Sequence, residues 1–330
     1  MSRTDRIGDV VLTLPLCAML KEQLGAEIVF LGRSYTLPVL AASDAVDRAV
    51  DWDAVPATAA ARRDALAALG ADVILHAYPR PEIARAARDA RIPMRVGTSH
   101  RWYHWLTCNA LEHFSRRRSP LHEAQLDVRL ARRLLGGEVP PIETVVRHVG
   151  LRPRVPLPEP VRERLDASRV NVVLHPRSKG SAREWPLDRW RTLAERMDPA
   201  RYRVFVTGSR EEGDTLRSWL GSAPPHVIDL TGRLALGELI ALFDAVDGMV
   251  AASTGPLHLA AAVGTHALGL FSPTPPVHPG RWAPLGPRAE WLAAAERCDA
   301  CRARRPGCSC MERISVDAVL ERVGAWAPRT

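Results

Sequence analysis

The sequence contains little lysine, few aromatic residues and no long apolar run. Lys21 and Lys179 are its only lysines, so nearly all of its positive charge is carried by guanidinium groups. No run of about 18 apolar residues occurs, which argues against a transmembrane helix. No nucleic-acid-binding signature accompanies the net charge of +8, which argues against a nucleic-acid partner. The 330 residues, 46% hydrophobic and 25% charged, are typical of a soluble globular protein with two domains.

The positive charge is unevenly distributed along the chain. Between Arg80 and Arg133 there are twelve arginines and five acidic residues, a local excess of seven positive charges. Two interpretations remain open. The segment forms a basic surface for an acidic acceptor or an anionic membrane, or it is a solvated helix face in an arginine-rich protein.

The first residues partly match a secretion signal. Two arginines precede the apolar segment 10–20, but Asp9 and Pro15 interrupt the pattern and no small-residue cleavage site follows. We therefore expect a buried first helix and a cytoplasmic protein. Few residues precede Gly8, so the strand expected before this helix is short or the assigned start is late.

The most informative segment is residues 251–264, AASTGPLHLAAAVG. It predicts a strand end, a hydroxyl-rich turn and a helix of small residues. Ser253 or Thr254 can cap that helix, and Gly255 allows another group to approach the backbone. Free N–H groups and the helix dipole favour an anion at a helix start, and His258 lies in the first turn. The segment therefore predicts a phosphate or diphosphate site.

Four other segments carry patterns spread along the chain. They are RIGDVVLTLP at 6–15, RVGTSHR at 95–101, LHPRSK with EWP at 174–186, and LTGRL at 230–234. Together with STGPLHLAAAVG and the LFSPT that follows at 270–274, they resemble glycosyltransferase family 9, the ADP-heptose:lipopolysaccharide heptosyltransferase family. The five motifs are collinear and cover nearly the whole chain, which makes the resemblance specific.

Alternating strand-like and helix-like segments predict parallel, doubly wound α/β sheets. Prolines concentrated at 151–160 predict a linker, placed at 151–168, between domains at 1–150 and 169–330. The resemblance implies the GT-B architecture, with two Rossmann-like domains facing a cleft. It assigns the acceptor to the first domain and the nucleotide sugar to the second, whose last helix, near 315–323, crosses back.

Gly8-Asp9 lies between the expected first strand and first helix, at the carboxyl end of a sheet, where α/β folds bind ligands. A carboxylate at a helix start is also an ordinary N-cap, so position alone leaves both interpretations open. The resemblance implies that Asp9 is the general base, which takes the proton of the acceptor hydroxyl that attacks the anomeric carbon.

The resemblance also implies the donor and acceptor contacts. The donor-binding residues would be Ser178, Lys179, Arg183, Glu211, Thr254, Gly255 and His258. Arg183 stands where the family commonly has lysine, and Ser253 where many members have aspartate; Glu212 fits the position of Glu211 equally well. The acceptor contacts would be Thr98, Arg101 and Glu123. Apolar positions predict a helix over 121–135, with His122 and Glu123 near its start.

Four cysteines cluster near the end of the chain: Cys298, Cys301, Cys308 and Cys310. Without a secretion signal, they are not expected to form a disulfide framework. Four thiolates with a C-x-x-C half suit a structural zinc or iron ion. The alternative is a metal-free loop, since many members of the resembling family have cysteines here.

The combined prediction is an inverting glycosyltransferase that transfers a heptose from ADP-heptose to a lipid-linked acidic saccharide of the lipopolysaccharide inner core. It needs no cofactor for catalysis and touches the cytoplasmic face of the inner membrane peripherally. Two alternatives remain open. One is another GT-B enzyme, such as a sugar-nucleotide epimerase, which needs no acceptor. The other is a non-catalytic binding protein stabilised by a metal at the cysteines.

Overall fold

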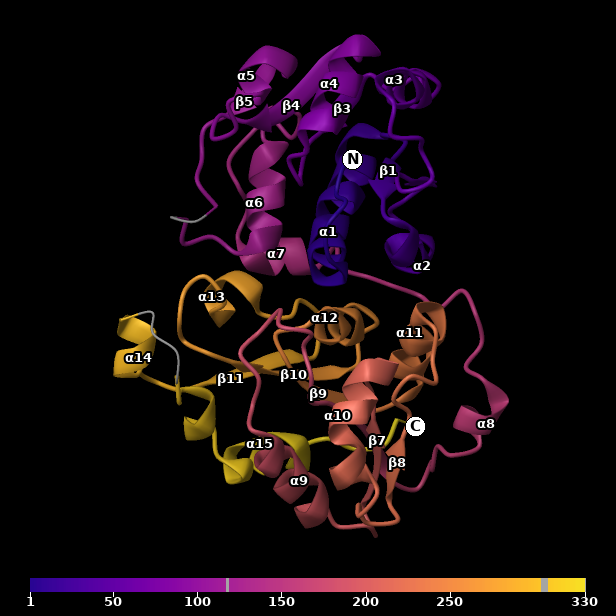
Figure 1. Cartoon of the computed structure of the whole chain (residues 1–330), viewed down its shortest axis with the longest axis vertical. Helices are drawn as coiled ribbons and strands as arrows, with labels where there is room; N and C mark the ends of the chain where they lie inside the picture. Colours follow the sequence, from indigo (N-terminus) through magenta and orange to yellow (C-terminus); the bar gives the residue numbers. More distant parts are fainter. Residues whose placement is uncertain (117–118, 304–307, 330) are drawn as a thin grey trace. The chain divides into compact units, whose positions relative to one another are not determined.

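The computed structural model describes residues 1–116, 119–303 and 308–329. The chain divides into two compact units, Met1–Gly150 and Leu151–Thr330. Each unit combines parallel strands with helices, and Figure 1 shows both. Among the described residues, no helix is both long enough and apolar enough to cross a bilayer.

The first unit alternates helices and strands. Its elements are α1 (Ile7–Leu24), β1 (Val29–Gly32), η1 (Ser34–Thr36), α2 (Leu37–Ala41), β2 (Arg48–Asp51), α3 (Ala59–Ala67), β3 (Val73–Leu75), α4 (Pro81–Asp89), β4 (Met94–Thr98), α5 (His104–Thr107), β5 (Ala110–Glu112), α6 (Glu123–Leu130) and α7 (Ile142–Val146). The predicted buried first helix is confirmed, because α1 buries eleven of its residues and ends at Gly25, whose φ of 61° suits glycine.

The first residues join two small sheets of this unit. β1 pairs with β2, and β3 with β4 and β5, all in parallel. Ser2 makes parallel bridges to Leu31 of β1 and to His76, which follows β3. Its N–H donates to the carbonyl of Leu75 at 2.9 Å, and the N–H of Leu31 donates to the carbonyl of Met1 at 2.8 Å. Residues 1–3 therefore act as a short central strand, which gives the spatial order β2, β1, residues 1–3, β3, β4, β5.

α6 is shorter than the predicted helix over 121–135. It ends at Leu130, and turns follow up to Gly136. The Nε groups of Arg132 and Arg133 both donate to the buried carboxylate of Glu112. Neighbouring side chains in a helix do not face the same way, so two consecutive arginines reach one carboxylate more easily from a turn.

The second unit contains one six-stranded parallel sheet. Its elements are α8 (Glu159–Arg162), β6 (Val170–His175), α9 (Leu187–Arg196), β7 (Tyr202–Val206), α10 (Arg210–Leu220), β8 (Val227–Asp229), α11 (Leu236–Ala245), β9 (Gly248–Ala252), α12 (Gly255–Ala262), β10 (His266–Phe271), α13 (Pro279–Trp282), β11 (Ala289–Ala293), α14 (Asp299–Arg302), η2 (Met311–Arg313) and α15 (Val316–Gly324). The strand order is β11-β10-β9-β6-β7-β8.

Helices cover both faces of this sheet (Figure 1). On one face, α9, α10 and α15 pack on the alternating side chains of β6 and β7, around the buried Trp185 and Trp190. On the other face, α12 packs against β9 and β10 and contacts α11. The last helix, α15, lies in the core of the second unit through Val316, Val319 and Val323. Its crossing to the first unit stays a prediction.

Candidate functional site

The strand orders locate a ligand site in each unit separately. Numbered along the chain, both sheets have the doubly wound order 3-2-1-4-5-6, with residues 1–3 as the first strand of the first unit. Such sheets bind ligands outside the carboxyl ends of their strands, where the order reverses. These points lie after residues 1–3 and β3 in the first unit, and after β6 and β9 in the second.

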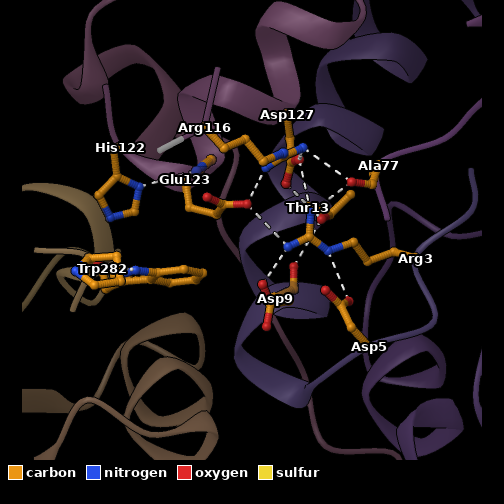
Figure 2. A network of polar contacts seen from close by, with 12 residues as sticks. Arg3, Asp5, Asp9, Thr13, Ala77, Arg116, His122, Glu123, Asp127 and Trp282 are labelled. Carbon is orange, nitrogen blue, oxygen red and sulfur yellow. Dashed lines mark hydrogen bonds and ion pairs between the residues drawn. The ribbon is translucent and has the colours of Figure 1, made fainter. Parts of the chain in front are cut away.

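A buried arginine occupies the first of these points. Arg3, 2% exposed, follows the bridged residue Ser2. Its guanidinium contacts four carboxylates, as Figure 2 shows. They are Asp5 at 3.0 Å, Glu123 at 3.2 Å, Asp127 at 3.1 Å, and Asp9 through Nη2. One guanidinium therefore ties the start of α1 to the start of α6.

A second arginine completes this network. Arg116 donates to Asp127 at 2.7 Å and also pairs with Glu123. The hydroxyl of Thr13 donates to the other oxygen of Asp127 at 2.8 Å. Both arginines also reach the carbonyl of Ala77, which follows β3, at 3.3 and 3.2 Å. Buried charges are stable only when paired and hydrogen-bonded, and this network meets that condition.

Accessibility separates the four carboxylates. The side chains of Asp127 and Glu123 are 0% and 2% exposed, whereas those of Asp9 and Asp5 are 17% and 15% exposed. Burial raises the pKa of Asp5 to about 7, against the opposing effect of Arg3. Burial likewise raises the pKa of Asp127. Asp9 and Asp5 are thus the two carboxylates of the network that a substrate could reach.

Asp9 is not the N-cap of its helix. The N-cap of α1 is Arg6, and Asp9 lies inside the first turn. The ordinary N-cap interpretation is therefore wrong. Arg3 holds the Asp9 carboxylate in place at the carboxyl end of the sheet. The negative charge of Asp9 also interacts favourably with the start of α1.

The three predicted acceptor contacts have different surroundings. Glu123 belongs to the Arg3 network. Thr98 ends β4 at the same edge of the sheet and is buried, and its backbone N–H lies 3.0 Å from Nδ1 of His104. Arg101 lies three residues further on and is exposed. The structure thus brings Glu123, but not Thr98 or Arg101, into described contact with the Asp9 network.

The second unit presents a helix start at its own switch point. β9 and α12 confirm the predicted strand–turn–helix, and Thr254 is the N-cap of α12. The Thr254 hydroxyl is buried and has no hydrogen-bond partner among the described residues. Pro256 in the first turn has no N–H, so Gly255 and Leu257 carry the open N–H groups of this helix start. His258 is buried one turn into the helix.

The loop after β6 holds other predicted donor residues. Both the backbone N–H and the hydroxyl of Ser178 donate to Glu184 at 2.8 Å. Lys179 has a positive φ of 47°, and its ammonium lies 3.3 Å from Glu211. Arg183 is exposed in the same loop. The last of these contacts brings Lys179, in the loop after β6, to Glu211, in the first turn of α10 after the neighbouring strand β7.

The two glutamates that sequence left as alternatives differ in environment. Glu212 accepts the N–H of Ser209 at 2.7 Å in a capping box of α10. Glu211 has a side chain 82% exposed. Of the two glutamates, Glu211 is the more accessible to a ligand.

Nearby, burial lowers the pKa of His175 to about 4, so this imidazole at the end of β6 is neutral at pH 7.

The four late cysteines converge. Their sulfur atoms all lie within 4.8 Å of one another, and three of the four residues are buried. The cluster follows β11 and is outside both switch points. Four thiols this close together could hold one metal ion.

Sequence patterns did not predict Arg3, Arg116, Asp5 or Asp127 as site residues. One signal was available. Glu123 and Asp127 are four residues apart, so in a helix their like charges repel on one face. Two carboxylates beside an apolar stripe require a nearby cation. The sequence does not say which of many arginines supplies it.

Comparison with known proteins extends these observations. The family model described as glycosyltransferase family 9 (heptosyltransferase) matches residues 151–311. No curated protein matches the chain. The solved structure of E. coli ADP-heptose lps heptosyltransferase II is 19% identical, with 98% of this chain and 96% of that chain covered and a TM-score of 0.74.

Two other solved structures are similar over nearly the full length. The family 9 glycosyl transferase from Veillonella parvula DSM 2008 is 16% identical, covering 98% of this chain and 94% of that one, with a TM-score of 0.77. E. coli heptosyltransferase WaaC with ADP is 18% identical, covering 98% of both chains, with a TM-score of 0.70. These likenesses show the GT-B fold. With the match of the family model to residues 151–311, the predicted resemblance to glycosyltransferase family 9 is confirmed for that part of the chain, and the protein is a glycosyltransferase.

Proposed function

We propose that this protein transfers a heptose, with inversion, from ADP-heptose to an anionic, lipid-linked saccharide of the lipopolysaccharide inner core, with Asp9 as general base. The observation that carries the proposal is the Asp9 carboxylate, partly exposed and held by buried Arg3 at a ligand-binding edge. A base must be accessible and fixed in direction, and Asp9 has both properties.

The chemistry is a single displacement. An acceptor hydroxyl oxygen attacks the anomeric carbon as the bond from that carbon to the diphosphate oxygen breaks. The hydroxyl proton passes to Asp9, and ADP leaves with its added negative charge. Attack from the side opposite the leaving group inverts the configuration at the anomeric carbon.

The second unit supplies groups that suit the leaving diphosphate. The start of α12 offers the N–H groups of Gly255 and Leu257 and the buried Thr254 hydroxyl. Lys179 and Arg183 add positive charge from the loop after β6. Such preorganised donors stabilise charge that develops in a transition state without a bound metal. In this proposal, Ser178 and His258 also line the donor site, and Glu211 contacts the ribose or the sugar.

The donor assignment is supported by the relatives. One similar E. coli heptosyltransferase structure contains ADP and another ADP-2-deoxy-2-fluoro heptose. A thermal-shift screen of the purified protein tests it. Saturation near 100 times Kd adds about 2.7 kcal/mol of stability. We expect ADP-heptose to stabilise most and UDP- and GDP-sugars little. A larger shift with UDP-N-acetylglucosamine would contradict the proposal.

The acceptor assignment includes the cytoplasmic face of the inner membrane. Trp102, Trp105 and Leu106, around the start of α5, have exposures of 69%, 58% and 66%, with exposed Arg101 beside them. Indole rings and arginines together suit an anionic lipid interface. Thr98, at the end of β4, and Glu123 would contact the saccharide in this proposal.

Sedimentation with vesicles tests this membrane contact. We expect the protein to bind vesicles that contain phosphatidylglycerol and to bind less as salt rises. The double variant W102S/W105S should bind fewer vesicles at every salt concentration. Equal sedimentation of this variant and the original protein would remove this surface from the proposal.

A further inference from the structure

We propose that Cys298, Cys301, Cys308 and Cys310 bind one structural metal ion, zinc or mononuclear iron. The sulfurs come from two short segments, one around the start of α14 and one just before η2. A tetrahedral zinc site with bonds of about 2.3 Å places its sulfurs about 3.8 Å apart. Here the sulfurs of Cys298 and Cys308 have that spacing, at 3.7 Å, whereas the sulfur of Cys301 lies closer to its neighbours, 3.1 Å from that of Cys310 and 2.6 Å from that of Cys308.

The backbone around the cluster suits thiolates. The N–H of Cys301 points to the sulfur of Cys298 at 3.3 Å, within the first turn of α14. The N–H of Cys298 points to the sulfur of Cys310 at 3.1 Å. Donors directed at metal-bound sulfur stabilise its negative charge and fix its orientation. The bond from Cys298 to Cys310 therefore connects the two segments that supply the four sulfurs.

The cluster has the burial of a structural site. Cys298, Cys301 and Cys310 are 7%, 4% and 0% exposed. Four protein ligands leave no open position for substrate, so the ion would not take part in the transfer. The compactness of the four sulfurs suits a single ion rather than a larger iron–sulfur cluster, and both zinc and iron accept four thiolates.

The site would fix a segment with little regular structure. Between β11 and η2, the described residues form only the single turn of α14. Arg297, just before the cluster, donates to the carbonyl of Pro273 in the loop after β10 at 3.3 Å. Just after it, Met311 and Ile314 enter the core, where Ile314 accepts the indole N–H of Trp185 at 3.0 Å. The ion would therefore hold this segment between the β10 loop and the core.

Metal analysis of protein purified under reducing conditions without added metal tests the proposal. We expect one equivalent of zinc plus iron per chain, and the ratio of the two identifies the ion. The double variant C301S/C308S should lose the metal. The control C108S, a half-buried cysteine of the first unit, should keep it.

Two further measurements keep the test independent of variant folding. A thiol-blocking mercurial added to the original protein should release one equivalent of metal, and cobalt added after metal removal should give the visible absorption of tetrahedral thiolate coordination. Metal far below one equivalent, with the four thiols freely titratable or joined as disulfides, would overturn the proposal. So would unchanged metal content in C301S/C308S. None of these measurements uses a substrate, so their failure would leave the proposed transferase function standing.

Discussion

The two switch points share a strand order but differ in how their polar groups are satisfied. In the first unit, Arg3 and Arg116 pair with four carboxylates, and every member of the network has a described partner. In the second unit, the buried hydroxyl of Thr254 at the start of α12 has none among the described residues. The ion pairs of the first unit fix the Asp9 side chain in the absence of substrate. The start of α12 in the second unit leaves hydrogen-bond donors open for an anion.

The difference matches the two tasks in a transfer reaction. A general base must already point in one direction when the acceptor arrives, so a closed network suits it. A diphosphate brings its own charge and acceptors, and a helix start with open N–H groups receives them. Substitutions at the two switch points test this contrast.

The strongest test replaces the proposed base. Asp9→Asn should reduce kcat by about 10²–10⁴-fold, because the amide cannot take a proton. Donor affinity, measured by calorimetry with ADP, should change little. Asp64→Asn, on the exposed surface of α3, is the matched control and should keep full activity. If Asp5→Asn instead caused the larger loss, the base would be Asp5.

Arg3 should be indispensable to the first unit. Arg3→Ala leaves four clustered carboxylates with Arg116 alone, and removal of one partner from a buried ion network costs about 3–5 kcal/mol. Denaturant unfolding should show this loss, while Arg33→Ala, whose partner Asp53 is exposed, should cost less than about 1 kcal/mol. A small loss for Arg3→Ala would mean that the network contributes little to stability.

Local signals explain what could be predicted from the sequence. The strand–turn–helix around Thr254 follows from neighbouring residues, and the structure has β9, the N-cap and α12 where the motif places them. The alternation of strands and helices predicted both doubly wound sheets. Ser2 bridges Leu31 of β1 and His76, which follows β3, so residues 1–3 stand where the first strand was expected.

Long-range contacts explain what could not be predicted. Arg3 meets Glu123 and Asp127, which are 120 and 124 residues away in the chain. Neither periodicity nor spacing indicates such a pairing. Likewise, the two cysteine pairs are close in sequence, but only the folded loop shows that all four sulfurs converge.

Removal of the Thr254 hydroxyl at the second switch point should have opposite effects on the stability of the protein and on its affinity for ADP. Thr254→Val replaces a buried hydroxyl without a described partner by a methyl group of the same shape, so the ligand-free protein should be as stable or more stable. Affinity for ADP should fall, because a hydrogen bond to a charged group contributes about 1.5–3 kcal/mol. Calorimetry and thermal unfolding of the same sample measure both. Thr192→Val, on α9 and outside both switch points, is the control.

The smallest expected effect is that of Asp5, whose contribution to stability changes with pH in the direction opposite to that of most carboxylates in folded proteins. Its pKa is raised from 3.8 to about 7, mainly by burial, so the folded state binds a proton that the unfolded state releases. This contribution to stability is complete below pH 3.8 and is lost as pH rises through 7. Asp5→Asn removes the titration. At pH 8 the variant should be more stable than the original protein by on the order of 1 kcal/mol, and this gain should disappear near pH 4. Urea unfolding at both pH values measures the difference. At each pH, the stability of Asp5→Asn is compared with that of the original protein. If the variant were less stable than the original at pH 8, and less so at pH 4, Asp5 would stabilise the network as a carboxylate.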